Sequence, residues 1–592
     1  MKSIRIFTVF VLLLLVCSST GFARTQPQAQ SKHIKIVLVG DSTVNDGGGW
    51  GAGFRTRFDS NVEIINLAKN GRSSKSFRDE GLWEPALAAK ADYILIQFGH
   101  NDVPGKGPQR ETDAATFHAN MASYVDEARA AGSTPVLVTS IIRRNFDERG
   151  RPITDDLQIY VAETRKVALE KHVPLIDLYA STIFMGVRMG KDYAHSLGRP
   201  GKDGKWDTTH LGPKGQEVIG ALAAEQLMQL EPSLKAHRVF LTWEEATRRP
   251  HEWYGSKEAV RIADNLLLYQ HDNGGWKKNI DMALPLDDQE RAEVISEKTE
   301  NDESTIDNTS TYTQLRYLAQ VYTATRQERF KDAFMRGFDY LLKAQYANGG
   351  WPQFYPKTGG YWTHITYNDD AMIGVMETLR LVVEKAPDYT FVSEKDRERA
   401  KQALAKGLDI ILKTQVVVKG RPTVWCAQHD ETTLAPTSAR SYELPSLSGD
   451  ESVGIVEYLM AIDKPSPEIV RSVQSAIAWF SQMKVTGMRQ ERKPVPDSTK
   501  GFEQFVYADP AAPPLWARFY EIGTNRPFFS GRDGVKKYVV SEIEYERRTG
   551  YRWYVDRPAK LLNEEYPQWM KKWAPGNDAR IMKPETNTAS AR

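Results

Sequence analysis

Five short apolar runs follow one another through the N-terminal third of the chain, at 34–39, 62–67, 93–98, 134–140 and 173–178. Their residues are mostly aliphatic, and each run ends in glycine or polar sequence. Apolar runs of this length are typical of strands buried on both faces of a parallel sheet. Because stretches with helical spacing, such as 114–131, separate the runs, the pattern predicts an α/β layered fold with right-handed crossovers.

The pattern changes at Trp243, after which apolar positions recur with helical spacing and strand-like runs nearly vanish. The sequence LLLYQHDNGGW at 266–276 is echoed by YLLKAQYANGGW at 340–351, a shift of 75 residues (351 − 276). A degenerate third copy runs from 411 to Trp425, and second helices are expected at 311–322, 370–383, 451–462 and 514–522. Repeated helical hairpins predict an all-α region that closes into an α/α toroid with a central groove; a plain helical solenoid is the alternative.

Composition narrows the class of protein. Of 592 residues, 41% are hydrophobic and 26% are charged, which excludes a disordered, collagen-like or multi-spanning membrane chain. The net charge is only +2, so no overall field attracts nucleic acid, and an acidic ligand requires a local basic site. Two cysteines exclude a disulfide scaffold.

The first 23 residues have the pattern of a secretory signal. Lys2 and Arg5 precede an apolar run at 6–17, and small residues follow up to Ala23, where cleavage is expected. Acylation of Cys17 as a lipoprotein is the alternative, but the Val16 before it is bulkier than that signal normally takes. The mature protein is therefore expected to be secreted or periplasmic. A polar linker at 24–32 leads into the first domain, and a polar tail at 576–592 ends the chain.

Several polar groups in the first domain fall where strands are expected to end. Ser42 follows the first strand, Gly71 the second and Asn101 the third, while Asp207 and His210 lie in a late loop before the last helix. Carboxyl ends of parallel strands meet at one edge of a sheet, where active sites of such folds lie. His210 could take the proton of the Ser42 hydroxyl, with Asp207 orienting the imidazole and two amide N–H donors stabilising an oxyanion. Taken singly, a Gly-Asp-Ser at a strand end is more often only a turn.

In this order, the four segments GDS, NGRS, GHND and DTTH resemble the SGNH (GDSL-type) hydrolases. The forms GDSTV and DTTHLGPKG are most similar to the rhamnogalacturonan acetylesterases of carbohydrate esterase family 12. The resemblance covers 33–235 and implies a flavodoxin-like three-layer domain that removes acetyl groups through an acetyl-enzyme without a cofactor. It implies that the catalytic triad consists of Ser42, Asp207 and His210. It also implies that the oxyanion donors are Ser42, Gly71 and Asn101.

The loops between the expected C-terminal helices are rich in carboxylates and arginines. Asp307 and Asp369 offer oxygen ligands of the kind that Ca²⁺ prefers, while Arg440 and Arg526 offer guanidinium forks that match carboxylates. This combination suits a polyuronate, because β-elimination removes a C5 proton that is acidic enough only after the neighbouring carboxylate is neutralised. For any one residue, a helix cap or a surface ion pair is the ordinary alternative.

Seven segments in order resemble the family 10 pectate lyases, which are α/α toroid enzymes that act on polygalacturonate with Ca²⁺. The segments are QHDNGGWKKN, STIDNTSTYTQL, NGGWPQFYP, YNDDAM, WCAQHD, TSARSYELPSLSGDES and GTNRPFFSGRDG. The resemblance covers 240–575. It implies that Arg440 is the base, that Arg526 binds a substrate carboxylate and that Trp351 lines a subsite, with Trp276 and Trp362 as further candidates. The implied Ca²⁺ ligands are Asp307 and Asp369, with Asn308 and Asp370 nearby.

Together these expectations describe a secreted, bifunctional, monomeric enzyme that degrades pectin. One domain deacetylates pectin or rhamnogalacturonan, and the other cleaves polygalacturonate by Ca²⁺-dependent β-elimination. The alternative is an acetylesterase whose helical domain binds pectin without cleaving it. A glycoside hydrolase would instead need a pair of carboxylic acids flanking the bond and would give saturated products.

Overall fold

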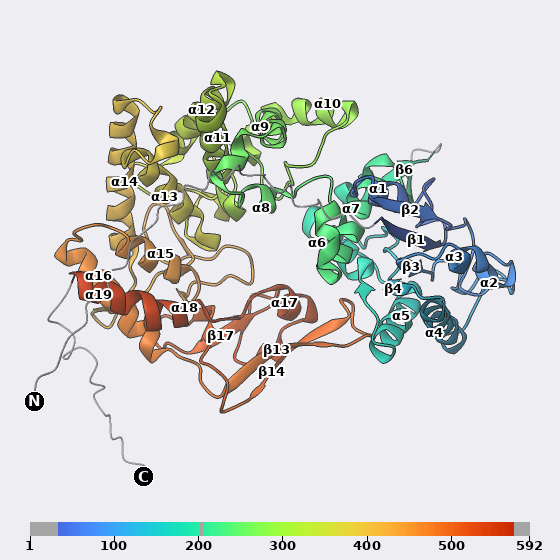
Figure 1. The fold of residues 1–592 in the computed structure, drawn as a ribbon. Coiled ribbons are helices and arrows are strands. Elements are labelled where there is room, and N and C mark those ends of the chain that lie inside the picture. The colour runs from blue at the N-terminus through green and yellow to red at the C-terminus, as the bar shows by residue number, and fades with distance from the viewer. Residues whose placement is uncertain (1–32, 202–204, 574–592) are drawn as a thin grey trace, which may run out of the picture.

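The structure is a computed structural model that describes residues 33–201 and 205–573. The expected signal at 1–23, the linker at 24–32 and the tail at 576–592 lie outside the described residues. The described part of the chain folds into an α/β domain followed by a larger, mainly helical domain (Figure 1). None of the described helices combines the length and apolar character needed to cross a membrane.

The N-terminal domain is built on a five-stranded sheet in which every pairing is parallel, in the order β2-β1-β3-β4-β5. The strands are β1 (Ile34–Gly40), β2 (Val62–Asn66), β3 (Tyr93–Gln97), β4 (Thr134–Val138) and β5 (Leu175–Ile176). This is the strand order of flavodoxin-like folds, so the predicted α/β domain is confirmed. The register places Ile36 of β1 between Ile64 and Tyr93 of the neighbouring strands.

Helices cover both faces of this sheet, which explains why its strands are apolar on both sides (Figure 1). Val37 and Val39 pack into one core with the helices α4 and α5, and Ile36 and Leu38 pack into another with α1 and α7. The helices are α1 (Gly51–Arg55), α2 (Ser76–Asp79), α3 (Glu84–Ala88), α4 (Ala114–Ala130), α5 (Leu157–Glu170), α6 (Leu178–Ser196) and α7 (Pro213–Leu230).

In the C-terminal domain, successive helices form antiparallel pairs in two layers. Helices α11, α13 and α15 pack on one another, and each also packs on the helix that follows it in the chain. The main helices are α8 (Trp243–Ala246), α9 (Lys257–Tyr269), α10 (Asp288–Ser296), α11 (Tyr312–Thr325), α12 (Glu328–Ala344), α13 (Ala371–Val383), α14 (Glu394–Thr414), α15 (Glu451–Met460) and α16 (Pro467–Gln482). Three short helices follow: α17 (Tyr545–Gly550), α18 (Arg557–Lys560) and α19 (Tyr566–Trp573).

The glutamine of each sequence repeat makes the same pair of hydrogen bonds in the structure. The side-chain amide of Gln270 donates to Gly274 O of its own loop (2.9 Å) and to Ala333 O of the next hairpin (2.9 Å). Gln345 makes the equivalent pair of bonds to Gly349 and Ala403, and Gln415 makes it to Thr423 and Ser472. Each repeated glutamine therefore ties one helical hairpin to the next.

The prediction of an all-α second domain needs correction, because this domain also contains short strands. Residues 514–522, predicted to be a helix, instead form β15 (Trp516–Ala517) and β16 (Phe519–Tyr520). Pairing with distant segments explains the difference, since β15 pairs with β19 and β16 pairs with both β12 and β17. The other strands are β8 (Ile365–Thr366), β9 (Val417–Val418), β10 (Arg421–Pro422), β11 (Gln428–His429), β12 (Leu447–Ser448), β13 (Met488–Pro494), β14 (Phe502–Ala508), β17 (Pro527–Ser530), β18 (Lys536–Lys537) and β19 (Tyr554–Val555).

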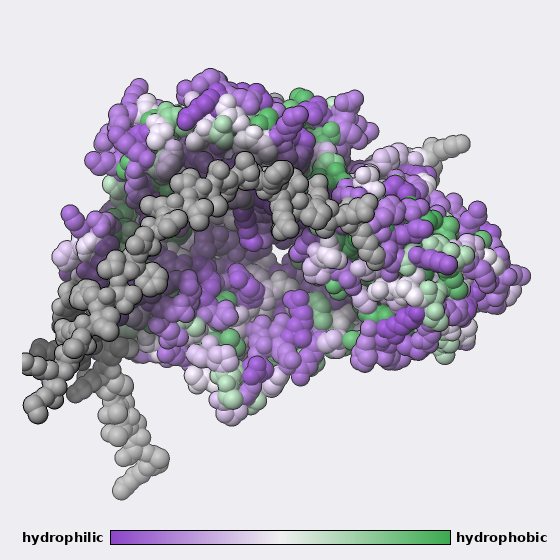
Figure 2. All heavy atoms as spheres, viewed as in Figure 1, coloured by the Kyte–Doolittle hydropathy of each residue, from purple (hydrophilic) through white to green (hydrophobic). Residues whose placement is uncertain are grey.

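The two domains meet along the covalent joint, where Lys214 also pairs with Glu293 and Arg188 bonds to Asn279, and at the tip of the β13–β14 hairpin, which reaches α5 of the first domain (Figure 1). Arg165 of α5 is 2% exposed. Its guanidinium donates to Ser498 O (2.7 Å) and Pro496 O (3.1 Å) at the hairpin tip and pairs with Asp177 of its own domain (2.9 Å). Figure 2 shows a mainly hydrophilic surface with a hollow between the two domains.

Candidate active sites

A serine, a histidine and an aspartate form a continuous hydrogen-bonded chain in the N-terminal domain. His210 Nε2 lies 2.9 Å from Ser42 Oγ, and His210 Nδ1 lies 2.9 Å from Asp207 Oδ2. The side chains of His210 and Asp207 are 40% and 36% exposed, so the chain of bonds is open to a ligand. This is the geometry that lets an imidazole take a hydroxyl proton while a carboxylate stabilises the imidazolium.

The turn that carries Ser42 is fixed by buried polar bonds beneath it. Asp41 accepts from the backbone N–H and the hydroxyl of Thr43 (2.8 and 2.7 Å), and Gln97 at the end of β3 donates to the same hydroxyl (2.7 Å). Trp50 in turn donates to Gln97 (2.9 Å). Ser42 is therefore held at the carboxyl edge of the sheet, as the sequence predicted.

Asp207 and His210 lie on a strand rather than in the loop that was predicted. They belong to β7 (Trp206–Leu211), which pairs with β6 (Gly198–Pro200). Asp207 Oδ1 accepts the backbone N–H groups of Thr209 (2.8 Å) and His210 (2.9 Å). Partial burial raises the pKa of Asp207, but the bonds from these N–H groups outweigh it and hold the pKa below its ordinary value. Asp207 thus stays ionised beside the imidazole.

Arg144 holds this strand from behind, and the sequence analysis missed it. Its side chain is buried, and its guanidinium donates to Asp207 O (2.7 Å) and His210 O (2.6 Å). Its own backbone N–H donates to Thr208 O (2.8 Å). No local sequence motif marks it, because the bonds join segments more than 60 residues apart.

Two of the three predicted oxyanion donors, Gly71 and Asn101, are linked through Arg72. Asn101 Nδ2 donates to Arg72 O (3.1 Å), which ties the third strand end to the residue after Gly71. Gly71 has φ of 76°, a left-handed conformation that favours glycine. The amide of Asn101 carries a second hydrogen, so this bond leaves a donor for a developing oxyanion.

Asp307 and Asp369, the predicted Ca²⁺ ligands, lie on two neighbouring turns of the C-terminal domain. The turns Asp307–Thr309 and Asn368–Asp370 pack against each other. Asp307 is 3% exposed; Lys278 forms an ion pair with its Oδ2, and its Oδ1 has no hydrogen-bond partner among the described residues. A buried carboxylate oxygen without a partner, on a turn that packs against the turn of Asp369, fits a hard divalent cation.

Arg440 is half-exposed and is held by a carboxylate three residues away. Its Nε lies 2.8 Å from Glu443 Oε2 and its Nη2 2.5 Å from Glu443 Oε1, which also accepts from the Tyr551 hydroxyl (2.8 Å). Burial lowers the pKa of Arg440, but the bonds to Glu443 outweigh it and raise the pKa above its ordinary value. Burial raises the pKa of Tyr361 above its ordinary value.

Arg518 is a second cation at this site that the sequence analysis missed. It is 4% exposed and lies 3.5 Å from Asp369 Oδ1, and it also pairs with the buried Glu451. Its guanidinium stands 4.5 Å from the ring centroid of Tyr551. Through Tyr551 and Glu443, Arg518 connects the Asp369 turn to Arg440, so the structure brings Asp307, Asp369 and Arg440 into one charged cluster.

Comparison with known proteins assigns both domains. Residues 38–218 match the GDSL-like lipase/acylhydrolase family, and residues 270–562 match the pectic acid lyase family. The chain is 38% identical over 226 residues to rhamnogalacturonan acetylesterase RhgT of Bacillus subtilis (strain 168), covering 35% of this chain and 95% of that protein. The N-terminal domain belongs to the GDSL-like family of these acetylesterases, and the C-terminal domain matches the pectic acid lyase family. The chain is an enzyme with an esterase domain and a lyase domain.

Two further relatives are similar to one domain each. The probable rhamnogalacturonan acetylesterase YesY of Bacillus subtilis (strain 168) is 30% identical over 204 residues, covering 33% of this chain and 93% of that protein. A mutant of a family 10 polysaccharide lyase from Cellvibrio cellulosa, solved in complex with trigalacturonic acid, is 34% identical. The match covers 55% of this chain and 96% of that chain, with a TM-score of 0.47.

Trp351 does not line a subsite in the lyase domain, which corrects the prediction. Its side chain is 0% exposed and its Nε1 donates to Leu341 O (2.7 Å). Trp276 and Trp425 occupy the equivalent positions of the other repeats and donate to Leu266 O and Ile411 O. These tryptophans are therefore core residues that hold the helical hairpins together. Trp362, which is half-buried beside Tyr361, is the accessible aromatic of the predicted set.

Arg526 lies apart from the charged cluster of the lyase domain. It is exposed at the turn between β16 and β17, and its guanidinium stacks on the ring of Tyr538, 3.4 Å from the centroid. Its role in binding substrate therefore stays a prediction, and Arg518 is the cation that the structure places next to Asp369.

Proposed function

We propose that the chain is an exported, monomeric enzyme that degrades acetylated pectin with two active sites. In this proposal residues 1–23 direct export, residues 33–235 form the esterase and residues 240–575 form the lyase as an α/α toroid. The basic and apolar N-terminal sequence supports export. The layered helical hairpins and their repeated glutamine bonds support the toroid.

The esterase is proposed to remove acetyl groups from pectin or rhamnogalacturonan. The observation that carries this assignment is the Ser42–His210–Asp207 chain, with 2.9 Å at each link. Ser42 Oγ attacks the acetyl carbonyl carbon while His210 takes the hydroxyl proton. The sugar oxygen then leaves with that proton, and water, activated by His210, releases acetate from the acetyl-enzyme. The names of the two Bacillus relatives support rhamnogalacturonan as the acetylated polymer.

The lyase is proposed to cleave polygalacturonate by Ca²⁺-dependent β-elimination. Asp307 and Asp369 would hold the ion, since Asp307 offers a buried oxygen that lacks a partner. Bound Ca²⁺ would neutralise the carboxylate of the sugar at the reacting bond. Arg440 would take the C5 proton, and Arg518 would add positive charge near Asp369. Because Glu443 keeps Arg440 protonated, a base role predicts that activity rises toward alkaline pH.

One experiment tests both halves of this proposal. Purified protein is given polygalacturonate at alkaline pH, and the ultraviolet absorbance of unsaturated uronide is followed with Ca²⁺ and with excess chelator. Acetate release from acetylated pectin is measured in parallel. We expect absorbance that rises only with Ca²⁺ and acetate release that the chelator leaves unchanged. Binding of the polymer without any rise in absorbance would refute the lyase and favour a pectin-binding module.

A further inference from the structure

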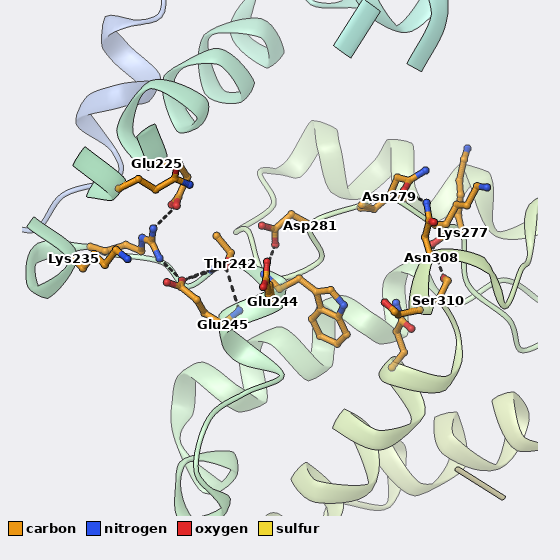
Figure 3. A pocket seen from close by; sticks show the side chains of 17 residues that line it. Glu225, Lys235, Thr242, Glu244, Glu245, Lys277, Asn279, Asp281, Asn308 and Ser310 are labelled. Carbon is orange, nitrogen blue, oxygen red and sulfur yellow. Dashed lines mark hydrogen bonds and ion pairs between the residues drawn. The ribbon is translucent and has the colours of Figure 1, made fainter. Parts of the chain in front are cut away.

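A cavity of 510 Å³ lies where the esterase and lyase domains meet. The esterase side contributes Gln229 from the end of α7 and Lys235 from the short helix Pro232–His237, and the lyase side contributes Lys278 and Asn308. Figure 3 shows Lys235 and Asn308 toward opposite ends of this cavity. Its volume falls in the range of roughly 300–1,000 Å³ that is typical of ligand sites.

The lyase end of the cavity lies beside the turn that carries Asp307. Lys278 forms the ion pair with Asp307, and Asn308 is the next residue in the chain. Asn308 Nδ2 donates to Asn279 Oδ1 (2.7 Å), which also accepts from Arg188 of the esterase helix α6. The esterase domain is therefore linked through Asn279 to the turn that carries Asp307, and the neighbours of Asp307 line the cavity.

Each acidic side chain that lines the cavity has a partner in the protein, and the exposed Glu244 pairs with Arg248 (2.8 Å). Glu225 and Glu245 both form ion pairs with Arg238. Asp281 is largely buried and accepts the backbone N–H of Trp243 (2.9 Å). Lys235, in contrast, is exposed and has no carboxylate partner among the described residues. The esterase end thus offers Lys235 as a cation without a carboxylate partner among the described residues, whereas Lys278 at the lyase end is paired with Asp307.

We propose that this cavity is a binding subsite built by both domains, which takes uronate residues of the same polygalacturonate chain that is bound at the lyase site. The inference rests on the proposed lyase function. Lys235 pairs with a sugar carboxylate, and the side-chain amides of Gln229 and Asn308 bond to ring hydroxyls. Because Gln229 and Lys235 belong to the esterase part of the chain, a lyase domain alone lacks this end of the subsite.

The test compares wild type with Lys235→Gln on oligogalacturonates of increasing length and on the polymer. The control is Lys90→Gln, since Lys90 is also exposed but follows α3, on the side of the esterase domain away from the lyase domain (Figure 1). We expect the ratio of variant to wild-type KM to grow with chain length and to reach about two- to five-fold on the polymer at low salt. This increase should shrink in high salt, where exposed charges are screened.

A KM ratio that is the same at every chain length, or equal to that of Lys90→Gln, would overturn the subsite. Failure of the proposed lyase function would look different, because wild type itself would then form no unsaturated product. In that case the affinity of wild type and Lys235→Gln for polygalacturonate is measured by direct binding. Weaker binding by the variant would support a shared pectin site, and equal binding would refute it.

Discussion

Replacing Arg144 by Met should impair the esterase and spare the lyase. Arg144 is 4% exposed, and one of its nitrogens donates to Asp207 O and His210 O, which belong to the two residues that act on Ser42. A hydrogen bond from a charged donor contributes about 1.5–3 kcal/mol, so the variant removes about 3–6 kcal/mol of interactions that hold β7 in place. Water and local relaxation would recover part of this.

The expected loss of esterase activity comes from displacement of Asp207 and His210, because Arg144 itself takes no part in the reaction. A shift of about 1 Å in a catalytic group can cost about 10²-fold in rate, so we expect esterase kcat/KM to fall by about 10²-fold. Free energy of unfolding of the esterase domain should fall by about 2–4 kcal/mol, because two partly buried carbonyl oxygens lose their donor. Acetate release, thermal unfolding and lyase activity are measured on the same preparation, so the lyase serves as the internal standard of folding.

Arg143→Met is the matched control, since Arg143 is the neighbouring arginine, is 21% exposed and pairs only with Asp155 (2.6 Å) among the contacts described. Arg144→Lys should restore part of the activity through a single donor. The reasoning would be refuted if Arg144→Met kept esterase kcat/KM within about three-fold of wild type, or if Arg143→Met lost as much.

Three further substitutions test the two sites. Ser42→Ala should lower acetate release by about 10³-fold or more while leaving the formation of unsaturated uronide intact; loss of both would point to misfolding. Asp307→Ala should raise the Ca²⁺ concentration for half-maximal lyase activity by about 10-fold or more, and an unchanged Ca²⁺ response would exclude Asp307 as a ligand. Glu443→Gln removes the carboxylate that raises the pKa of Arg440, so that pKa should fall. If Arg440 is the base, the rising limb of the pH–rate profile then moves to lower pH, whereas a profile that stays in place while KM rises would make Arg440 a carboxylate-binding cation.

The sheet and the positions of Ser42 and Asn101 after its strands were predictable because their signals are local. Each strand is an apolar run of its own, and parallel strands bring their carboxyl ends to one edge, so Ser42 and Asn101 could be placed without coordinates. The strand that carries Asp207 and His210 was predicted as a loop because β7 pairs only with a three-residue partner across a polar segment. Such a pairing leaves no alternation in the sequence.

The lyase cluster was predictable only in part. Asp307, Asp369 and Arg440 stand in segments with many polar groups, but Arg518 lies between aromatic residues and acquires its role through contacts with Glu451 and Asn368, 67 and 150 residues away in the chain. Trp351 shows the opposite case. A tryptophan after Gly-Gly is compatible with a sugar platform or with a core, and only the bond from its Nε1 to Leu341 O decides for the core.

The bonds from Arg165 to the tip of the β13–β14 hairpin help to keep the esterase and lyase domains together. The carbonyl partners of Arg165 lie 331–334 residues further along the chain, so these bonds can form only after the hairpin has been synthesised. Once the hairpin has docked, a protease cut in the segment that joins the two domains would leave two fragments that remain associated through these bonds. The nicked enzyme should therefore run as two bands under denaturing conditions and as one particle under native conditions.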